Sequence, residues 1–136
     1  MRSAGPRGLP CMDVDEYLVR GVLEAWARAV READVDAVMA VHSDDVVLFD
    51  VPPPMTVTGM GDYLDQWRLF WDAQGEGLFD VSDLTVVAGG GVAFAHGLLR
   101  IGAAGTEGFR VRLTVGLRRV EGRWLITHEH HSVPAG

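Results

Sequence analysis

The order of two kinds of periodicity restricts the fold of this chain more than any other feature. Apolar residues first recur at helical spacing, between residues 13 and 41 and again after Gly59. Later they alternate with polar residues in long segments joined by glycine-rich turns. These segments are residues 79–87, 91–101, 109–120 and 123–133. Helices followed by an antiparallel meander predict an α+β fold: a cone of three N-terminal helices on a strongly curved, mostly antiparallel sheet that encloses a pocket.

Local signals place the ends of the predicted helices. Asp13 is a suitable N-cap, and Glu16 three residues later completes a capping box. Asp34 caps a second helix over residues 35–41, which predicts that His42 lies at a helix end without a chemical role. A short strand over residues 46–49 follows, and then a third helix that opens at Gly59–Gly61 and ends at Gly75 and Gly77.

Length and charge exclude several classes of protein. A chain of 136 residues suits one domain, here residues 13–134, preceded by a flexible segment over residues 1–12. The net charge of −7 argues against nucleic acid as a partner, and no apolar run approaches the length of about 20 residues that spans a membrane. A single cysteine, Cys11, excludes an intramolecular disulfide framework. Because the start of the chain lacks a secretory signal pattern, a cytoplasmic location is expected.

The last predicted strand carries imidazoles where apolar residues are expected. Strict alternation places Trp124, Ile126, His128 and His130 on one face, which begins as a buried face. Two histidines facing an apolar space suggest proton transfer or polar ligand recognition. The same alternation puts Glu129 and His131 on the opposite face, so they are assigned to solvent or to an oligomer interface.

The order of these motifs carries a resemblance to a known superfamily. The chain shows a helix, Asp34-Val35-Asp36, Ser43-Asp44-Asp45, a strand ending in Asp50-Val51-Pro52, a helix opened by glycine, and a closing Gly-x-Trp-x-Ile-x-His-x-His-x-Ser-x-Pro strand. This order resembles the nuclear transport factor 2-like superfamily, in particular SnoaL-like proteins and ketosteroid isomerase homologues. The resemblance covers residues 13–134 and implies the cone-shaped fold.

Position by position, the resemblance to ketosteroid isomerases implies one retained and two lost catalytic groups. An ungapped match places Asp50 at the general base of those enzymes. The same register puts Trp26 where the oxyanion-binding tyrosine stands, and the last hairpin puts Thr114 near the second, protonated acid. The chain therefore resembles these enzymes in its base and departs from them in both strong hydrogen-bond donors.

The predicted pocket combines this base with side chains of the sheet. Asp50, His128 and His130 are the predicted catalytic residues. The predicted substrate-binding residues are Trp26, Trp67, Trp71, Phe94, His96, Arg112, Thr114, Trp124 and Ile126. Four alternatives remain open: Asp50 as a solvated turn residue, His96 as a polar residue satisfied by backbone, Arg112 as part of an exposed arginine stripe, and the Trp67 and Trp71 pair as core or helix packing.

Metal and cofactor sites are not expected. His128 and His130 with His96 or Asp50 could supply three ligands, but a His-x-His pair on a strand is common by chance. No glycine-rich nucleotide motif and no nucleophile elbow occur in the sequence. The expectation is a site without metal, cofactor or covalent intermediate.

Two functions fit this pattern. The first is a cofactor-independent acid–base enzyme of the isomerase, dehydratase, cyclase or epoxide-opening type, acting on a small hydrophobic, carbonyl-bearing molecule. The lysine-free composition and the resemblance to SnoaL-like proteins imply a polyketide- or enediyne-pathway intermediate in bacterial secondary metabolism. The alternative is a non-catalytic small-molecule-binding or scaffold protein that uses the same pocket. A homodimer through the sheet is also expected, because Leu99, Ile101, Val111, Leu113, Val115 and Leu125 are assigned to an outer face that no helix covers.

Overall fold

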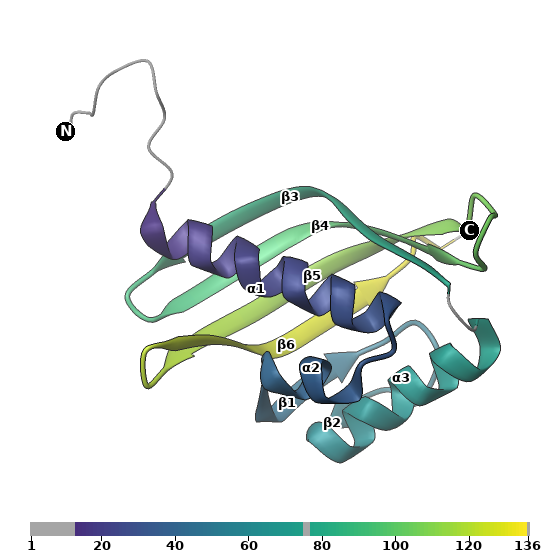
Figure 1. Ribbon diagram of the computed structural model, residues 1–136, viewed down its shortest axis with the longest axis horizontal. Helices are drawn as coiled ribbons and strands as arrows, with labels where there is room; N and C mark the ends of the chain where they lie inside the picture. Colours follow the sequence, from purple (N-terminus) through teal and green to yellow (C-terminus); the bar gives the residue numbers. More distant parts are fainter. Residues whose placement is uncertain (1–12, 75–76, 136) are drawn as a thin grey trace.

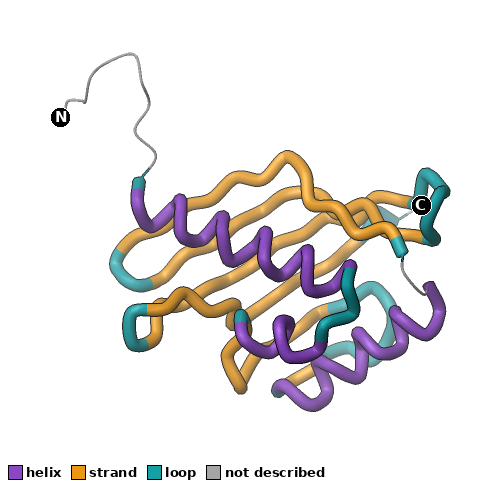
Figure 2. The backbone as a smooth tube through the Cα atoms, viewed as in Figure 1, coloured by secondary structure: helices purple, strands orange, loops and turns teal. Residues whose placement is uncertain are grey.

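Three helices pack on one face of a six-stranded sheet in the computed structural model, which describes residues 13–74 and 77–135 (Figure 1). The predicted flexible segment 1–12, with Cys11, and the predicted helix end at Gly75 lie outside the described residues. The chain forms its helices before its four long strands, which the sequence colours of Figure 1 show, and Figure 2 distinguishes helices from strands by colour. The predicted α+β class and the curved, mostly antiparallel sheet are confirmed.

The helices are α1 (Val14–Arg31), α2 (Val35–Ala40) and α3 (Met60–Gln74). Asp34 caps α2 as predicted, because its side chain accepts a hydrogen bond from the backbone N–H of Ala37 at 3.1 Å. Asp13 is the N-cap residue of α1, but its side chain makes no cap hydrogen bond. The predicted capping box at the start of α1 is therefore not formed.

The sheet has the strand order β2-β1-β6-β5-β4-β3. Its strands are β1 (His42–Phe49), β2 (Val57–Thr58), β3 (Leu78–Gly89), β4 (Val92–Gly102), β5 (Phe109–Val120) and β6 (Arg123–Ser132). All neighbours are antiparallel except β1 and β6, which run parallel. The four-strand meander and the positions of its turns were predicted from the sequence. β2 was not predicted, and the predicted start of β1 lies four residues too late.

The core lies between the inner face of the sheet and the helices. α1 crosses the inner face and contacts β3 and β6, whereas α3 packs against β1 and β2 (Figure 1). Large side chains from both layers are fully buried there, among them Trp26 of α1, Tyr63 of α3 and Phe79 of β3. The Trp26 and Phe79 rings meet edge to face at 5.2 Å, a favourable aromatic geometry. The large aromatic side chains Tyr63 and Trp67 of α3 are buried in this core too.

The outer face of the sheet differs from the predicted one. Leu99, Val111, Leu113 and Val115 are buried under the helices, and Ile101 lies on the same inner face. Of the residues assigned to the outer face, Leu125 alone lies there. It pairs with Arg118 of β5, and paired residues of neighbouring strands point to the same face of the sheet. The apolar side chains exposed on the outer face are instead Phe49, Val87, Val92 and Phe94. The assignment was wrong because it shifted the alternation of side chains along β4 and β5 by one residue. Side chains that face the helices were therefore assigned to the outer face.

Among the residues that the structure describes, no helix combines the length and apolar character needed to cross a membrane.

Candidate active site

A cavity of about 320 Å³ opens beside the end of β1, between α3 and the inner face of the sheet. Its walls are largely apolar, and its polar lining residues are Asp50, Gln66, Gln74 and His131. The apolar lining includes Leu48, Trp67, Phe70, Phe79, Leu99, Ile101, Phe109 and Val111. Among the described residues, no arginine belongs to this lining, so the cavity suits a neutral apolar molecule with a few polar atoms.

Asp50 lies at the mouth of this cavity because the sequence ends β1 there. Phe49 is the last strand residue, and the prolines at 52–54 lack the N–H that a continuing central strand requires. One carboxylate oxygen of Asp50 accepts from the backbone N–H of Val51 at 2.8 Å, and the other accepts from the amide of Gln66 at 3.2 Å. The side chain is 18% exposed, so it faces the cavity rather than bulk solvent.

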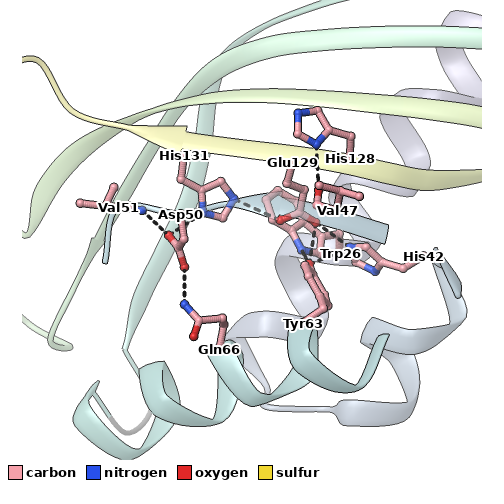
Figure 3. Close-up of polar contacts among 10 residues, drawn as sticks. All are labelled: Trp26, His42, Val47, Asp50, Val51, Tyr63, Gln66, His128, Glu129 and His131. Atoms are coloured by element: carbon pink, nitrogen blue, oxygen red, sulfur yellow. Dashed lines mark hydrogen bonds and ion pairs between the residues drawn. The ribbon is translucent and has the colours of Figure 1, made fainter. Parts of the chain in front are cut away.

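A β-bulge in β6 brings two further ionisable groups to the inner face. Leu117 of β5 pairs with Ile126, but the next β5 residue, Gly116, pairs with His128. Thr127 is therefore an extra residue without a partner, and the alternation of side chains changes phase there. As a result Glu129 and His131 share the inner face with Ile126. Figure 3 shows both side chains on the α3 side of β6.

His131 links the cavity to the interior. Its Nδ1 lies 3.4 Å from a carboxylate oxygen of Asp50, and its Nε2 lies 3.1 Å from Oε1 of Glu129 (Figure 3). The rings of Trp26 and Trp67 lie 6.3 Å and 6.2 Å from the imidazole. The imidazole is thus held between two carboxylates in an otherwise aromatic environment.

A buried polar cluster lies beneath this pair. Oε2 of Glu129 accepts from the hydroxyl of Tyr63 at 2.5 Å and contacts Nε2 of His42 at 2.6 Å. The other ring nitrogen of His42 lies 2.6 Å from the carbonyl oxygen of Val38. Trp26 donates its indole N–H to the hydroxyl of Tyr63 at 3.2 Å. Every polar side chain of the cluster therefore has a partner, as burial requires.

The electrostatics of the site favour the charged forms of His131, Glu129 and Asp50 and the neutral form of Tyr63. Burial alone would lower the pKa of His131, but hydrogen bonds to Asp50 and Glu129 raise it from 6.5 to about 9. Burial would raise the pKa of Glu129, yet hydrogen bonds from His131 and His42 lower it from 4.5 to about 2. The pKa of Asp50 is lowered too, because the hydrogen bond and charge of His131 outweigh burial. Burial and the charge of Glu129 raise the pKa of Tyr63 well above its usual value.

The predicted position of His128 and His130 in the pocket is wrong. Both lie on the outer face of the sheet, where their rings contact Phe49 with centroids 4.8 Å and 5.4 Å away. Nδ1 of His128 lies 2.8 Å from the carbonyl oxygen of Val47 (Figure 3). The prediction assumed unbroken alternation along the last strand, and the bulge at Thr127 reverses the faces after that residue.

Of the nine predicted substrate-binding residues, Trp67 lines the cavity. Two groups of residues account for the corrections. Trp26, Trp124 and Ile126 are buried in the core, and Trp71 is partly buried with its indole N–H bonded to the carbonyl of Val30. Phe94, His96, Arg112 and Thr114 lie exposed on the outer face. The second group was misplaced because outward residues of β4 and β5 were paired with the outward histidines of β6.

Sequence reasoning missed most of the residues around Asp50. His131 and Glu129 were assigned to the wrong face, His42 to an inert helix end, and Gln66 was not considered. Helical spacing from Trp67 could have found Tyr63, which lies four residues earlier on the same face of α3. No comparable sequence signal marks the bulge. Within the described part of the chain, no three His, Cys, Asp or Glu side chains are arranged to hold a metal ion.

Comparison with known proteins identifies relatives by sequence and by structure. Residues 19–136 match the SnoaL-like domain family. A search of curated proteins returned no match. An NTF2-like (nuclear transport factor 2-like) protein of unknown function from Pseudomonas putida KT2440 is 35% identical, and the match covers 89% of this chain and 87% of that one with a TM-score of 0.83.

Two more distant structures share the fold. A candidate dehydratase of the NTF2-like family from Streptomyces avermitilis is 18% identical, with 91% and 99% of the two chains covered and a TM-score of 0.72. A candidate ketosteroid isomerase from Shewanella frigidimarina is 19% identical, with 82% and 92% covered and a TM-score of 0.69. With the family match over most of its length, the chain belongs to the SnoaL-like family of the NTF2-like superfamily.

Proposed function

We propose that this protein is a cofactor-independent acid–base catalyst for a small, neutral, hydrophobic molecule. The observation that carries the proposal is the pair formed by the carboxylate of Asp50 and the imidazole of His131 in the wall of an apolar cavity. The ionised carboxylate can accept a proton from a bound molecule, and the protonated imidazole, which lowers the pKa of Asp50, can also stabilise the negative charge that develops on the substrate. His131 thereby takes the role that the sequence suggested for His128 or His130.

The cavity narrows the class of substrate. Over residues 13–74 and 77–135 its lining has no arginine to hold a carboxylate or phosphate group, since Arg112 lies on the outer face of the sheet. The cationic ring of His131 is already paired with Asp50 and Glu129. The amide of Gln66, which now donates to Asp50, can turn to a substrate carbonyl or hydroxyl instead. A neutral carbonyl-bearing or hydroxylated ring compound fits this lining. The reaction proposed is of the isomerase, dehydratase, cyclase or epoxide-opening type, and the resemblance of the sequence to SnoaL-like proteins leads us to propose an intermediate of polyketide or enediyne type as the natural substrate.

A second candidate function is a binding or scaffold module without turnover. It is favoured because the polar atoms of the site are already satisfied within the protein. Both oxygens of Asp50 and both ring nitrogens of His131 have partners within the chain. A structural ion pair would have the same contacts. The two functions differ in whether Asp50 can take a proton from a bound molecule.

Ring opening of 5-nitrobenzisoxazole separates the two functions. This neutral aromatic compound loses its C3 proton to a base while its N–O bond breaks, and the product is a coloured 2-cyano-4-nitrophenolate. Binding is followed by quenching of tryptophan fluorescence, because Trp67 lines the cavity. We expect saturable ring opening by the wild-type protein and a loss of about 10²–10⁴-fold in Asp50→Asn, the usual effect of removing a general base.

Asp45→Asn is the matched control, because Asp45 lies on the same strand but is exposed and paired with Arg118. It should leave ring opening unchanged. If the compound binds and the wild-type protein opens it no faster than Asp50→Asn does, the protein is a binding module and the proposal fails.

A further inference from the structure

Glu129 is a buried carboxylate that does not touch the cavity. Its side chain is fully enclosed, and none of its atoms belongs to the cavity lining. Its hydrogen bonds come from three side chains on three different elements: Tyr63 of α3, His42 of β1 and His131 of β6 itself. A carboxylate left inside a small domain with three converging donors is ionised, because each donor stabilises the charged form.

The geometry also fixes the protons on His131. A neutral imidazole has one N–H, so it can donate to one acceptor only. In this structure Nε2 faces Oε1 of Glu129 at 3.1 Å and Nδ1 faces Oδ1 of Asp50 at 3.4 Å. Carboxylate oxygens cannot donate when ionised, so both contacts are attractive only if His131 carries a proton on each nitrogen. The ring is then a cation between two anions.

We propose that Glu129 is a positioning residue of the site: it orients His131 toward Asp50 as a doubly protonated ring and so keeps Asp50 ionised inside the apolar cavity. The role in catalysis rests on the proposed function. The charge state of His131 does not, since it can be measured on the protein without a substrate.

The surroundings of His131 support this assignment. Asp50 at the end of β1 and Glu129 on β6 are the charged groups that face the ring. α1 and α3 contribute the uncharged rings of Trp26 and Trp67, and β5 contributes Leu113 as the paired residue. With the two carboxylates as its charged neighbours, the ring has a pKa of about 9. Removing the charge of Glu129 removes one of the two carboxylates that stabilise the His131 cation. Burial, which disfavours the cation, remains.

Tyr63→Phe provides a matched control for Glu129→Gln. It removes one donor to Glu129, but it keeps the charge of Glu129 and its contact with His131. Both substitutions disturb the same buried cluster, so both are expected to lower stability. Only Glu129→Gln should change the protonation of His131. A merely structural role for Glu129 predicts that neither variant does.

The experiment is an NMR titration of wild-type, Glu129→Gln and Tyr63→Phe proteins labelled with ¹⁵N-histidine and ¹³C-aspartate, with His131→Gln and Asp50→Asn to assign the two signals. In the wild type both ring nitrogens of His131 should stay protonated beyond neutral pH. In Glu129→Gln the titration midpoint should fall by at least one pH unit, and the carboxyl ¹³C signal of Asp50 should titrate at higher pH. In Tyr63→Phe both midpoints should stay within about half a unit of the wild type.

A wild-type His131 that is neutral at pH 7, or a Glu129→Gln variant with an unchanged midpoint, overturns the proposal. The first result needs no variant, so the test stands even if Glu129→Gln does not fold. If the titrations behave as expected but 5-nitrobenzisoxazole is bound and not opened, the proposed function fails while the charge assignment holds. If ring opening is active, its acid limb should move to higher pH in Glu129→Gln and stay in place in Tyr63→Phe.

Discussion

Raising the pH should destabilise this protein through one buried residue, His131. The pKa of His131 rises from 6.5 to about 9 on folding, because hydrogen bonds to Asp50 and Glu129 outweigh burial. A group whose pKa is raised by folding stabilises the protein fully below its unfolded value, and this contribution is lost as the pH rises through the folded value. The stabilisation is therefore complete below about pH 6.5 and disappears between about pH 6.5 and 9.

The size of the effect follows from the difference between the two pKa values. A shift of one unit corresponds to about 1.4 kcal/mol, so the whole stabilisation amounts to about 3 kcal/mol, of which about 2 kcal/mol is already lost at pH ~8. Asp50 and Glu129 share this interaction, so it is counted once. For a small domain it is a large part of a total unfolding free energy of about 5–15 kcal/mol.

The assay is guanidinium unfolding of the wild type and His131→Gln at several pH values from about 6 to 10, followed by tryptophan fluorescence. The variant keeps a neutral polar side chain but has no titrating ring, so groups elsewhere that titrate in this range cancel in the comparison. We expect the stability advantage of the wild type to shrink by about 3 kcal/mol over the series at similar denaturant dependence. An advantage that is the same at pH 6 and pH 10 would refute the charge assignment of His131.

Four other outcomes follow from the same geometry. Folding lowers the pKa of Glu129 to about 2, so its stabilisation is present above about pH 4.5 and is lost as the pH falls toward 2; acid titrations should show a steeper loss in the wild type than in Glu129→Gln. Trp67→Ala should cost about 3–5 kcal/mol in denaturant unfolding and abolish quenching by 5-nitrobenzisoxazole, because Trp67 is both core and cavity wall. Arg112→Ala and Thr114→Val should leave binding and opening of this compound within about two-fold in kinetic assays, as expected for surface positions outside the site. We still expect a homodimer through the outer sheet face, so sedimentation should give twice 14.8 kDa for the wild type and a monomer for Phe94→Asp, and a monomeric wild type would contradict it.

The fold could be predicted because it depends on patterns that extend over many residues. Helical spacing before residue 75 and alternation after residue 78 survive local irregularities, and the glycine turns delimit the strands. Asp50 could be placed for a related reason: the prolines that follow it end the strand whatever the rest of the chain does. The family resemblance depends on the order of such motifs, and the match over residues 19–136 confirms it.

The rest of the site could not be predicted, because single residues decide it. One extra residue in β6, Thr127, moves Glu129 and His131 inward and His128 outward, and nothing in the local sequence distinguishes this strand from a regular one. His42 follows the predicted second helix and was assigned to a helix end without a chemical role, whereas it begins β1 and is buried against Glu129. A rule that counts alternate residues fails completely beyond a bulge, so a correct secondary structure gave an incorrect site.

The stability of the fold does not account for the charges inside it. Across the ladder from β6, Glu129 pairs with Val115 and His131 pairs with Leu113, so the neighbouring inward positions of β5 are apolar. Replacing a buried ion pair by well-packed apolar side chains is often neutral or stabilising, by about 1–4 kcal/mol. A scaffold of this shape could therefore carry apolar residues at both β6 positions at little cost in stability. The chain instead keeps an anion, a cation and a second anion in sequence from the interior to the cavity, ending at Asp50. Such an arrangement costs desolvation and holds Asp50 ionised at the wall of an apolar cavity, as the proposed proton transfer needs.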